Sequence, residues 1–235
     1  MLGALPSTSL TLIPPALRAL HAAHPTLSVR VVEAHNDELI SMVRTNQIEF
    51  ALATVLEPAA DLAFHPLLAD SWFAVFPRGH ELADRQELHW RDLVPYDLIL
   101  LSQGSSARAQ FELAVQAEGA SPAASSRYDV THMTTAAGLV RQGLGITLLP
   151  RLALPELNLK GLLSKPLDDA TARRTIGLLH RQDRSLSPAA QAFAAQLGKA
   201  AVQIERKLPP MRAPARGAGK PRKSVAPRTS ALRTG

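Results

Sequence analysis

The stretch "LGALPSTSLTLIPPALRAL", residues 2–20, joins two apolar runs through a cluster of hydroxyl side chains. A secretory signal would begin with basic residues, whereas the first basic residue here is Arg18, beyond the apolar run. Two adjacent prolines, Pro14 and Pro15, fit the first turn of a helix, where some backbone N–H groups have no intrahelical partner. The stretch therefore predicts a strand, a hydroxyl-rich turn and a helix, and a cytoplasmic rather than an exported protein.

The composition narrows the class of protein. The 235-residue chain has no cysteine, which excludes disulfides, thiolate metal sites and thiol redox chemistry. Seven of the 26 Lys and Arg residues lie in 208–235, which has no acidic residue, so residues 1–207 carry 19 basic and 20 acidic groups. The net charge of +6 therefore belongs to a tail rich in Pro, Gly and Ala. We expect this tail to be disordered and solvated, the alternative being a weak contact with a polyanion.

Strand-like and helix-like segments alternate along residues 1–207. No apolar run reaches the roughly 18–20 residues of a membrane span. Runs rich in Val, Ile, Leu and Phe predict strands at 27–33, 49–55, 71–77, 97–102, 145–150 and 175–180. Amphipathic segments between them include helices predicted over 107–118 and 134–142, which end at Gly119 and Gly143. This alternation predicts an α/β fold with a mainly parallel sheet.

Polar side chains gather at four of the predicted strand-to-helix junctions. A helix N-terminus offers free N–H groups and a partial positive charge, and ligands of open α/β sheets bind at the carboxyl ends of strands. Any single hydroxyl here is also explained as a helix cap, so the prediction depends on the repetition. The candidate ligand-binding residues are Ser7, Thr8, Asn36, Gln103, Ser105, Thr131 and His132, and a small polar or carboxylated molecule would suit them.

Three longer stretches resemble one protein family. "LPST…LIPPALRALHAAHPTLSVRVVEAHNDELISMVRTNQIEFALA" resembles the first half of the effector-binding domain of LysR-type transcriptional regulators. "VFPRGHELADRQELHWRDLVPYDLILL" and "TTAAGLVRQGLGITLLPRLAL" are similar to later parts of that domain, so the resemblance covers about residues 3–200 in order. The chain departs from the family at Asn46, Gln47 and Glu49, where relatives usually have Gly and Asp.

The resemblance implies a type 2 periplasmic-binding-protein-like fold, in which two Rossmann-like α/β subdomains are joined by crossing strands. Subdomain I would comprise about 1–73 and 188–206, and subdomain II about 77–178. The crossing hinge strands would be 71–77 and 175–183. Residues 208–235 would form the basic disordered tail. A small-molecule effector would occupy the cleft. The family's effector contacts carry over to Ser7 and Asn36, and loosely to the loops that hold Gln103, Ser105, Thr131 and His132.

The function implied is sensing of a small metabolite by the regulatory domain of a transcriptional regulator. The resemblance also implies a homodimer, with tetramers in full-length relatives. The family's N-terminal winged helix-turn-helix is absent from this chain, so we expect no DNA recognition by this chain itself. The alternative is a stand-alone solute-binding protein of the same fold, which would need export.

An enzyme is not expected from the motifs. His21 and His24 lie three residues apart on a predicted helix, but no third metal ligand is paired with them by spacing. The glycines at 143–145 lead into a strand, whereas a dinucleotide-binding fingerprint opens a helix. No G-x-S-x-G nucleophile turn is present. We therefore expect no catalytic residues, no metal and no cofactor.

Overall fold

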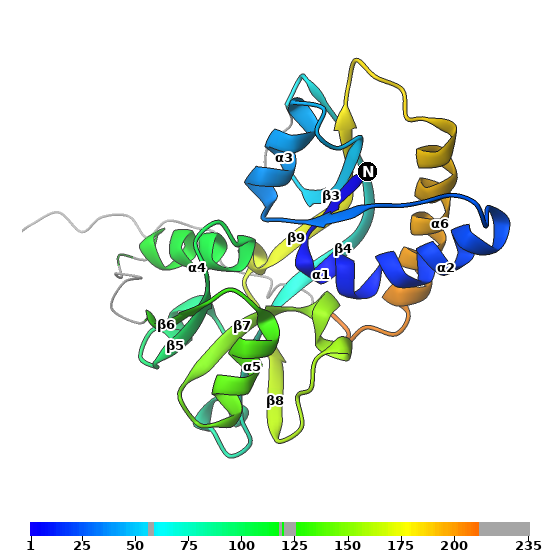
Figure 1. Cartoon of the computed structure of the whole chain (residues 1–235). Coiled ribbons are helices and arrows are strands. Elements are labelled where there is room, and N and C mark those ends of the chain that lie inside the picture. Colours follow the sequence, from blue (N-terminus) through cyan, green and yellow to red (C-terminus); the bar gives the residue numbers. More distant parts are fainter. Residues whose placement is uncertain (56–58, 118, 120–125, 212–235) are drawn as a thin grey trace, which may run out of the picture.

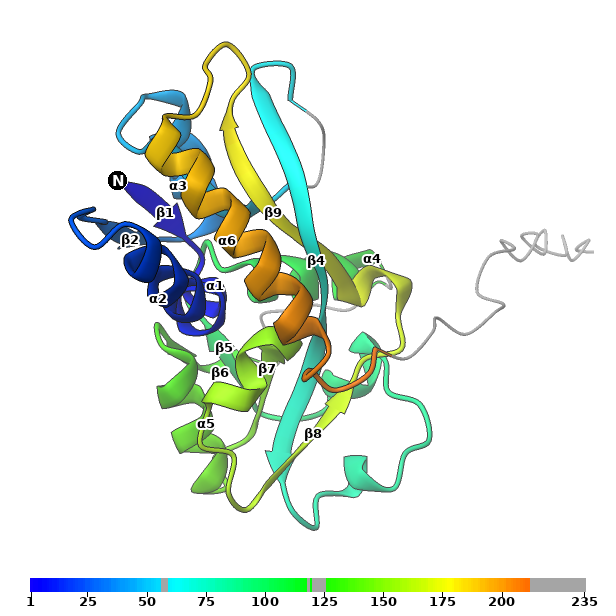
Figure 2. The same cartoon turned by 90° about the vertical axis from the view of Figure 1, so that its right-hand side faces the viewer.

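The chain folds into two α/β lobes that share two long crossing strands, β4 (Leu62–Pro77) and β9 (Arg173–Arg181) (Figure 1). The computed structural model describes residues 1–55, 59–117, 119 and 126–211. Seen from the side in Figure 2, β4 runs through both lobes. None of the helices in the described part of the chain has the length and apolar character of a membrane span.

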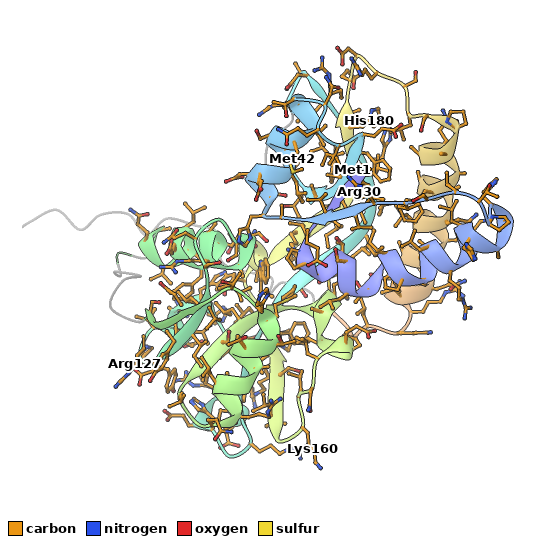
Figure 3. All side chains as sticks on the ribbon, viewed as in Figure 1. Met1, Arg30, Met42, Arg127, Lys160 and His180 are labelled. Carbon is orange, nitrogen blue, oxygen red and sulfur yellow. The ribbon has the colours of Figure 1, made fainter. Side chains whose placement is uncertain are left out.

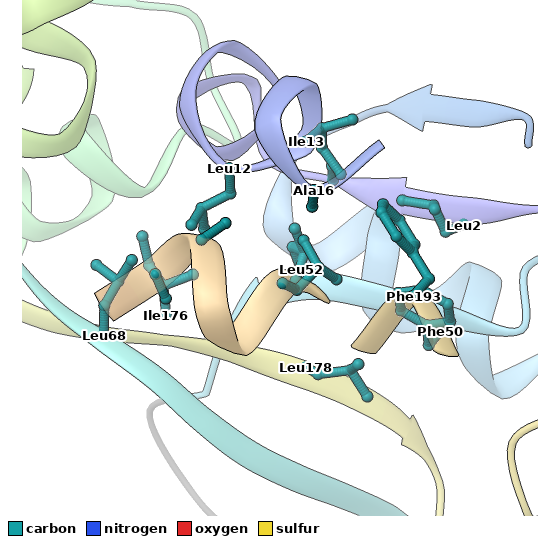
Figure 4. Close-up of a cluster of buried hydrophobic side chains, with 14 of the residues drawn as sticks. Leu2, Leu12, Ile13, Ala16, Phe50, Leu52, Leu68, Ile176, Leu178 and Phe193 are labelled. Carbon is teal, nitrogen blue, oxygen red and sulfur yellow. The ribbon is translucent and has the colours of Figure 1, made fainter. Parts of the chain in front are cut away.

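The first lobe is a five-stranded sheet in the order β2-β1-β3-β9-β4. Strands β1 (Leu2–Ala4), β2 (Val31–Glu33) and β3 (Phe50–Thr54) are parallel, and β9 runs antiparallel to β3. Helices α2 (Ile13–Ala23) and α6 (Pro188–Glu205) pack on one face, and α3 (Asn36–Arg44) packs on the other. In Figure 4, Phe193 of α6 lies against Phe50, with ring centroids 6.2 Å apart.

The second lobe is built around β4-β7-β5-β6, with β8 paired to β4. Its strands are β5 (Leu98–Leu101), β6 (Ser126–Val130), β7 (Ile146–Pro150) and β8 (Leu162–Pro166). Helix α4 (Ser106–Ala117) packs on one face and α5 (Met133–Arg141) on the other. Both end beside a glycine of positive φ, Gly119 and Gly143, as the sequence predicted. Short 3-10 helices complete the lobe: η1 (Glu81–Ala83), η2 (Trp90–Leu93), η4 (Arg151–Glu156) and η5 (Ala170–Ala172).

The opening stretch forms the strand, turn and helix that the sequence predicted, but the helical part is divided. Helix α1 (Pro6–Thr11) and α2 meet at Leu12, and α2 carries its prolines in the first turn. Asn46 has φ of 57°, a left-handed conformation that glycine adopts most easily and asparagine tolerates. The Glu49 carboxylate accepts a hydrogen bond from the backbone N–H of Ser187, at 2.6 Å, where α6 begins.

The expectation of a mainly parallel sheet was wrong. Of the eight pairings between strands of the described residues, four are parallel and four antiparallel. The antiparallel pairings all involve β4 or β9, because β9 opposes β3 and β4 in the first lobe and β4 opposes β7 and β8 in the second. Two strands, β6 and β8, lie outside the predicted apolar runs, since neither has a fully buried apolar run, and β6 was implied only by the junction predicted at Thr131.

The structure also locates where the chain crosses between the lobes. Strand β4 pairs with β9 up to Ser71 and with β7 from Trp72 onward, and β9 begins at Arg173. The crossings therefore lie at 71–72 and 172–173. Of the predicted hinge strands, 71–77 lies mainly in the second lobe and 175–183 continues in the first. The subdomain boundaries proposed from the sequence stay a prediction.

The first residues of the predicted tail contact the folded chain, and the disorder expected for 208–235 stays a prediction. Leu208 is buried in the first-lobe core, in the same apolar cluster as Leu197 and Ala201 of α6. The backbone oxygen of Pro209 accepts a hydrogen bond from Arg151. Residues 212–235 of the predicted tail lie outside the described residues.

Figure 3 shows Arg127 and Lys160 at the far end of the second lobe, and Met42 and His180 on the first.

Two glycines test the packing of the first lobe. A Cβ on Gly177 in β9 would lie 2.5 Å from the backbone oxygen of His65, so Gly177→Ala should destabilise the fold by about 1–3 kcal/mol. A Cβ on Gly198 in α6 would meet no described atom within 4 Å, so Gly198→Ala should stabilise it by about 0.5–1 kcal/mol. Urea denaturation measures both. Equal unfolding free energies for the two variants would contradict this packing.

Candidate functional site

A cavity of about 440 Å³ lies between the two lobes. Residues from four strand-to-helix junctions line it: 5–7 before and within α1, 34–35 before α3, 105–107 at the start of α4, and 131–134 at the start of α5. The first two junctions belong to the first lobe and the other two to the second. A volume of this size is in the range of small-molecule sites. The cavity therefore gathers N-termini of helices from both lobes.

Four of the seven predicted site residues line this cavity: Ser7, Ser105, Thr131 and His132. Ser7 and Ser105 are almost fully buried, whereas Thr131 and His132 lie at the exposed rim. Ser105 also accepts a hydrogen bond from the backbone N–H of Arg108, at 3.3 Å, so it caps α4.

The other three predicted residues lie outside the lining, and each makes local contacts. The hydroxyl of Thr8 donates to the backbone oxygen of Leu5 at 2.8 Å. The side-chain oxygen of Asn36 accepts from the backbone N–H and the hydroxyl of Thr54, at 2.9 and 3.1 Å, which ties α3 to β3. With its amide oriented to present oxygen, Gln103 accepts from Arg108 at 3.1 Å.

The sequence analysis did not single out Arg174, the residue at the centre of the site. Arg174 is 9% exposed and lies at the start of β9, where the chain crosses between the lobes. It donates from Nε and Nη2 to one oxygen of Asp70, at 2.9 and 2.7 Å. It also donates to the hydroxyls of Ser7 and Ser106, each at 2.9 Å. One guanidinium thus binds side chains from both lobes.

Asp70 holds this arginine from β4. Its side chain is fully buried, and its second oxygen accepts from the backbone N–H of Leu152 at 3.0 Å. A sequence signal for the pair exists in the alternation of the two strands. Asp70 is in phase with the buried Leu68 and Trp72, and Arg174 with the buried Ile176, so both charges occupy inward positions.

Apolar side chains form much of the remaining wall. Trp72 lies under the guanidinium of Arg174, with the arginine carbon 4.5 Å from the ring centroid, and its indole N–H donates to Gln110. Leu10, Leu101 and Met133 also face the cavity. A cavity that combines a few polar groups with apolar walls is typical of a site for a small organic molecule.

The described residues give no sign of a metal centre or a catalytic pair at this cavity. No group of three or more potential metal-ligating side chains occurs among them. Two serines of the cavity, the buried Ser7 and the half-buried Ser106, bind Arg174, which is always protonated and cannot serve as a general base. What this arrangement can do chemically is offer hydrogen-bond donors to a bound molecule.

A cavity between two α/β lobes, lined by strand-to-helix junctions of both, defines a two-lobed small-molecule-binding domain. Residues 1–201 match the LysR substrate binding domain. The chain belongs to this family, the effector-binding domain of LysR-type transcriptional regulators, as the sequence resemblance implied.

Two regulators of Escherichia coli K12 illustrate the relationship. The uncharacterized HTH-type transcriptional regulator YbhD is 31% identical over 196 residues, which cover 83% of this chain and 61% of YbhD. The DNA-binding transcriptional dual regulator OxyR is 26% identical over 186 residues, covering 77% of this chain and 59% of OxyR. The chain therefore spans about three fifths of the length of these relatives.

Solved structures of the family share this fold. The H2O2-bound form of a cysteine-to-serine mutant of Corynebacterium glutamicum OxyR has a TM-score of 0.75 and 27% identity, and the match covers 90% of this chain and 68% of that one. The effector binding domain of QuiR in complex with shikimate has a TM-score of 0.71 and 19% identity, covering 86% and 96%. At 19% identity, the likeness to QuiR shows the fold alone.

Loss of Arg174 should destabilise the protein strongly. Arg174→Ala leaves the buried carboxylate of Asp70 without a counter-ion, at a cost of about 3–5 kcal/mol. Arg108→Ala is the matched control, because its partners Glu112 and Asp129 are partly exposed, and it should cost at most about 1 kcal/mol. Denaturant unfolding measures both, and similar losses would contradict the central role of the Arg174–Asp70 pair.

Proposed function

We propose that this chain binds a small polar or carboxylated molecule in the cavity between its lobes, as the effector of a LysR-type regulator. The observation that carries the proposal is the convergence of strand-to-helix junctions of both lobes on one cavity whose floor contains Arg174. Because such a ligand would contact both lobes, its binding would bias their relative orientation, and this bias would be the regulatory signal.

The electrostatics support a ligand with an acceptor group. The N-termini of α4 and α5 carry partial positive charge toward the cavity, and the first turn of α5 has no side-chain cap. Apolar neighbours such as Trp72 and Met133 suit the carbon skeleton of an organic acid. Several relatives are named for hydrogen peroxide, but this chain has no thiol for peroxide to oxidise.

The proposal includes no catalytic activity and no cofactor. The relatives are transcriptional regulators, and in the described part of the cavity no serine is hydrogen-bonded to a histidine or carboxylate. Since transcription regulation takes place where bacterial DNA lies, we assign the chain to the cytoplasm within this proposal. DNA recognition would belong to a helix-turn-helix domain of the kind for which the relatives are named.

Ligand affinity separates a binding role of the hydroxyls from a structural one. A thermal-shift screen of small carboxylic acids would identify a ligand, and calorimetry would measure its affinity. Ser7→Ala and Thr131→Ala should each lose a hydrogen bond to a charged group, about 1.5–3 kcal/mol or roughly ten- to a hundredfold in affinity.

Thr8→Val is the matched control for these variants. Thr8 neighbours Ser7 in the same helix but lies outside the cavity lining, so the variant should lower the melting temperature and leave affinity unchanged. If Ser7→Ala and Thr131→Ala also melt lower but bind as tightly as the parent, the two hydroxyls have only local structural roles and the proposed site is wrong.

We also propose that the chain forms a homodimer with two-fold symmetry, because regulators of this family oligomerize. Static light scattering at roughly tens of micromolar, where a standard-size interface should hold, tests this. The expected mass is twice the 25.2 kDa of the chain. A mass of one chain at these concentrations would contradict the dimer.

A further inference from the structure

Arg174 determines which hydrogen-bonding role the two serines at the floor of the cavity can play. A guanidinium has only donors, so Ser7 Oγ and Ser106 Oγ are the acceptors in their 2.9 Å bonds to it. Their own hydroxyl protons then remain available. Among the described residues, none accepts a hydrogen bond from either hydroxyl, and both side chains line the cavity. The floor therefore presents two O–H donors, one from each lobe.

The positive charge of Arg174 is already compensated inside the protein. Asp70 takes two of its N–H groups, and the ring of Trp72 covers a face of the guanidinium. A ligand would therefore meet the arginine through the two serines. An acceptor group of the ligand that binds there would not meet an uncompensated positive charge. A ligand with one negative charge is therefore favoured over a ligand with two.

The rim of the cavity adds negative charge. Glu33 and Glu38 both line it and are exposed, and neither forms an ion pair within the described part of the chain. His35 and His132 are the other ionisable groups of the lining besides Arg174. A second negative charge on the ligand would face the carboxylates of Glu33 and Glu38.

We propose that the cavity selects monocarboxylates. The carboxylate would accept hydrogen bonds from Ser7 and Ser106, which Arg174 keeps turned toward it as a positioning residue. Glu33 and Glu38 would reject ligands with a second acidic group. This inference rests on the proposed function and deepens it, since it names the chemical class of the effector and the residues that select it.

Three probes that share a cyclohexane ring test this selection by calorimetry at about pH 8, where an imidazole is ordinarily neutral. They are cyclohexanecarboxylate, trans-cyclohexane-1,4-dicarboxylate and cyclohexylmethylamine. The monocarboxylate should bind at least about tenfold tighter than either of the others. The dicarboxylate carries a second negative charge, and the amine offers no hydrogen-bond acceptor. Equal or tighter binding of the dicarboxylate would overturn the inference, as would binding of none of the probes.

Variants then assign the selection to residues. Glu33→Gln combined with Glu38→Gln should raise the affinity for the dicarboxylate about five- to tenfold and change the monocarboxylate less than about threefold. Asp37→Asn is the control, because Asp37 lies in the same first turn of α3 but outside the lining. If Asp37→Asn has the same effect, the selection reflects overall charge and the assignment to Glu33 and Glu38 is wrong.

The role of Arg174 is read from Ser106→Ala and Arg174→Lys. Ser106→Ala should weaken the binding of the monocarboxylate about tenfold. Arg174→Lys should keep more affinity than Arg174→Gln, because lysine keeps the positive charge that pairs with Asp70 whereas glutamine does not. Unchanged affinity in Ser106→Ala would overturn the inference even if the arginine variants do not fold. If this cavity prefers dicarboxylates, only the selection of monocarboxylates is contradicted. If no small acid binds in it, the proposed function is contradicted as well.

Discussion

The ion pair between Arg174 and Asp70 lies where both crossing strands pass from one lobe to the other, and the geometry of the cleft depends on it. Replacing a buried ion pair with apolar residues is often neutral or stabilising, so stability alone is a weak reason to place two charges there. This pair does something that apolar residues cannot. Asp70 also binds the backbone N–H of Leu152 in the second lobe, and Arg174 reaches Ser7 in the first and Ser106 in the second. The same contacts that hold the crossing therefore arrange the polar floor of the cavity.

A second connection between the lobes lies at the end of α6. Arg151, buried in η4, donates to the carboxylate of Glu205 at 2.7 Å and to the backbone oxygen of Pro209 at 3.2 Å. Its bond to the backbone oxygen of Ala69 brings it to β4, close in sequence to Asp70. A ligand that changed the angle between the lobes would have to alter contacts at both places. The energy available for such a change is the difference between the ligand's affinities for the two arrangements, since equal affinity shifts nothing.

The sequence predicted the parts of the site that follow from local chain direction, and it missed the part that depends on the crossing. Ser7, Ser105 and Thr131 were found because a polar residue between an apolar strand and an amphipathic helix is a local pattern. Thr8, Asn36 and Gln103 share that pattern but make local contacts outside the lining, and a single sequence does not distinguish which way such side chains turn. Arg173 and Arg174 stand next to each other just before an apolar run. In a sequence, such a pair of basic residues looks the same as the solvated end of a strand. Its partner Asp70 is 104 residues away, so only the fold brings the two together.

The most direct test of the account is a map of backbone amide resonances during titration with cyclohexanecarboxylate. The account predicts that the largest shifts occur at the starts of α1, α4 and α5 and at Arg174, in both lobes at once. The chain offers a second cavity of about 410 Å³ in the first lobe, lined by residues that include Glu49, His180 and Arg184. Shifts confined to that cavity, or to one lobe, would contradict the claim that the ligand binds between the lobes on the floor that Arg174 organises.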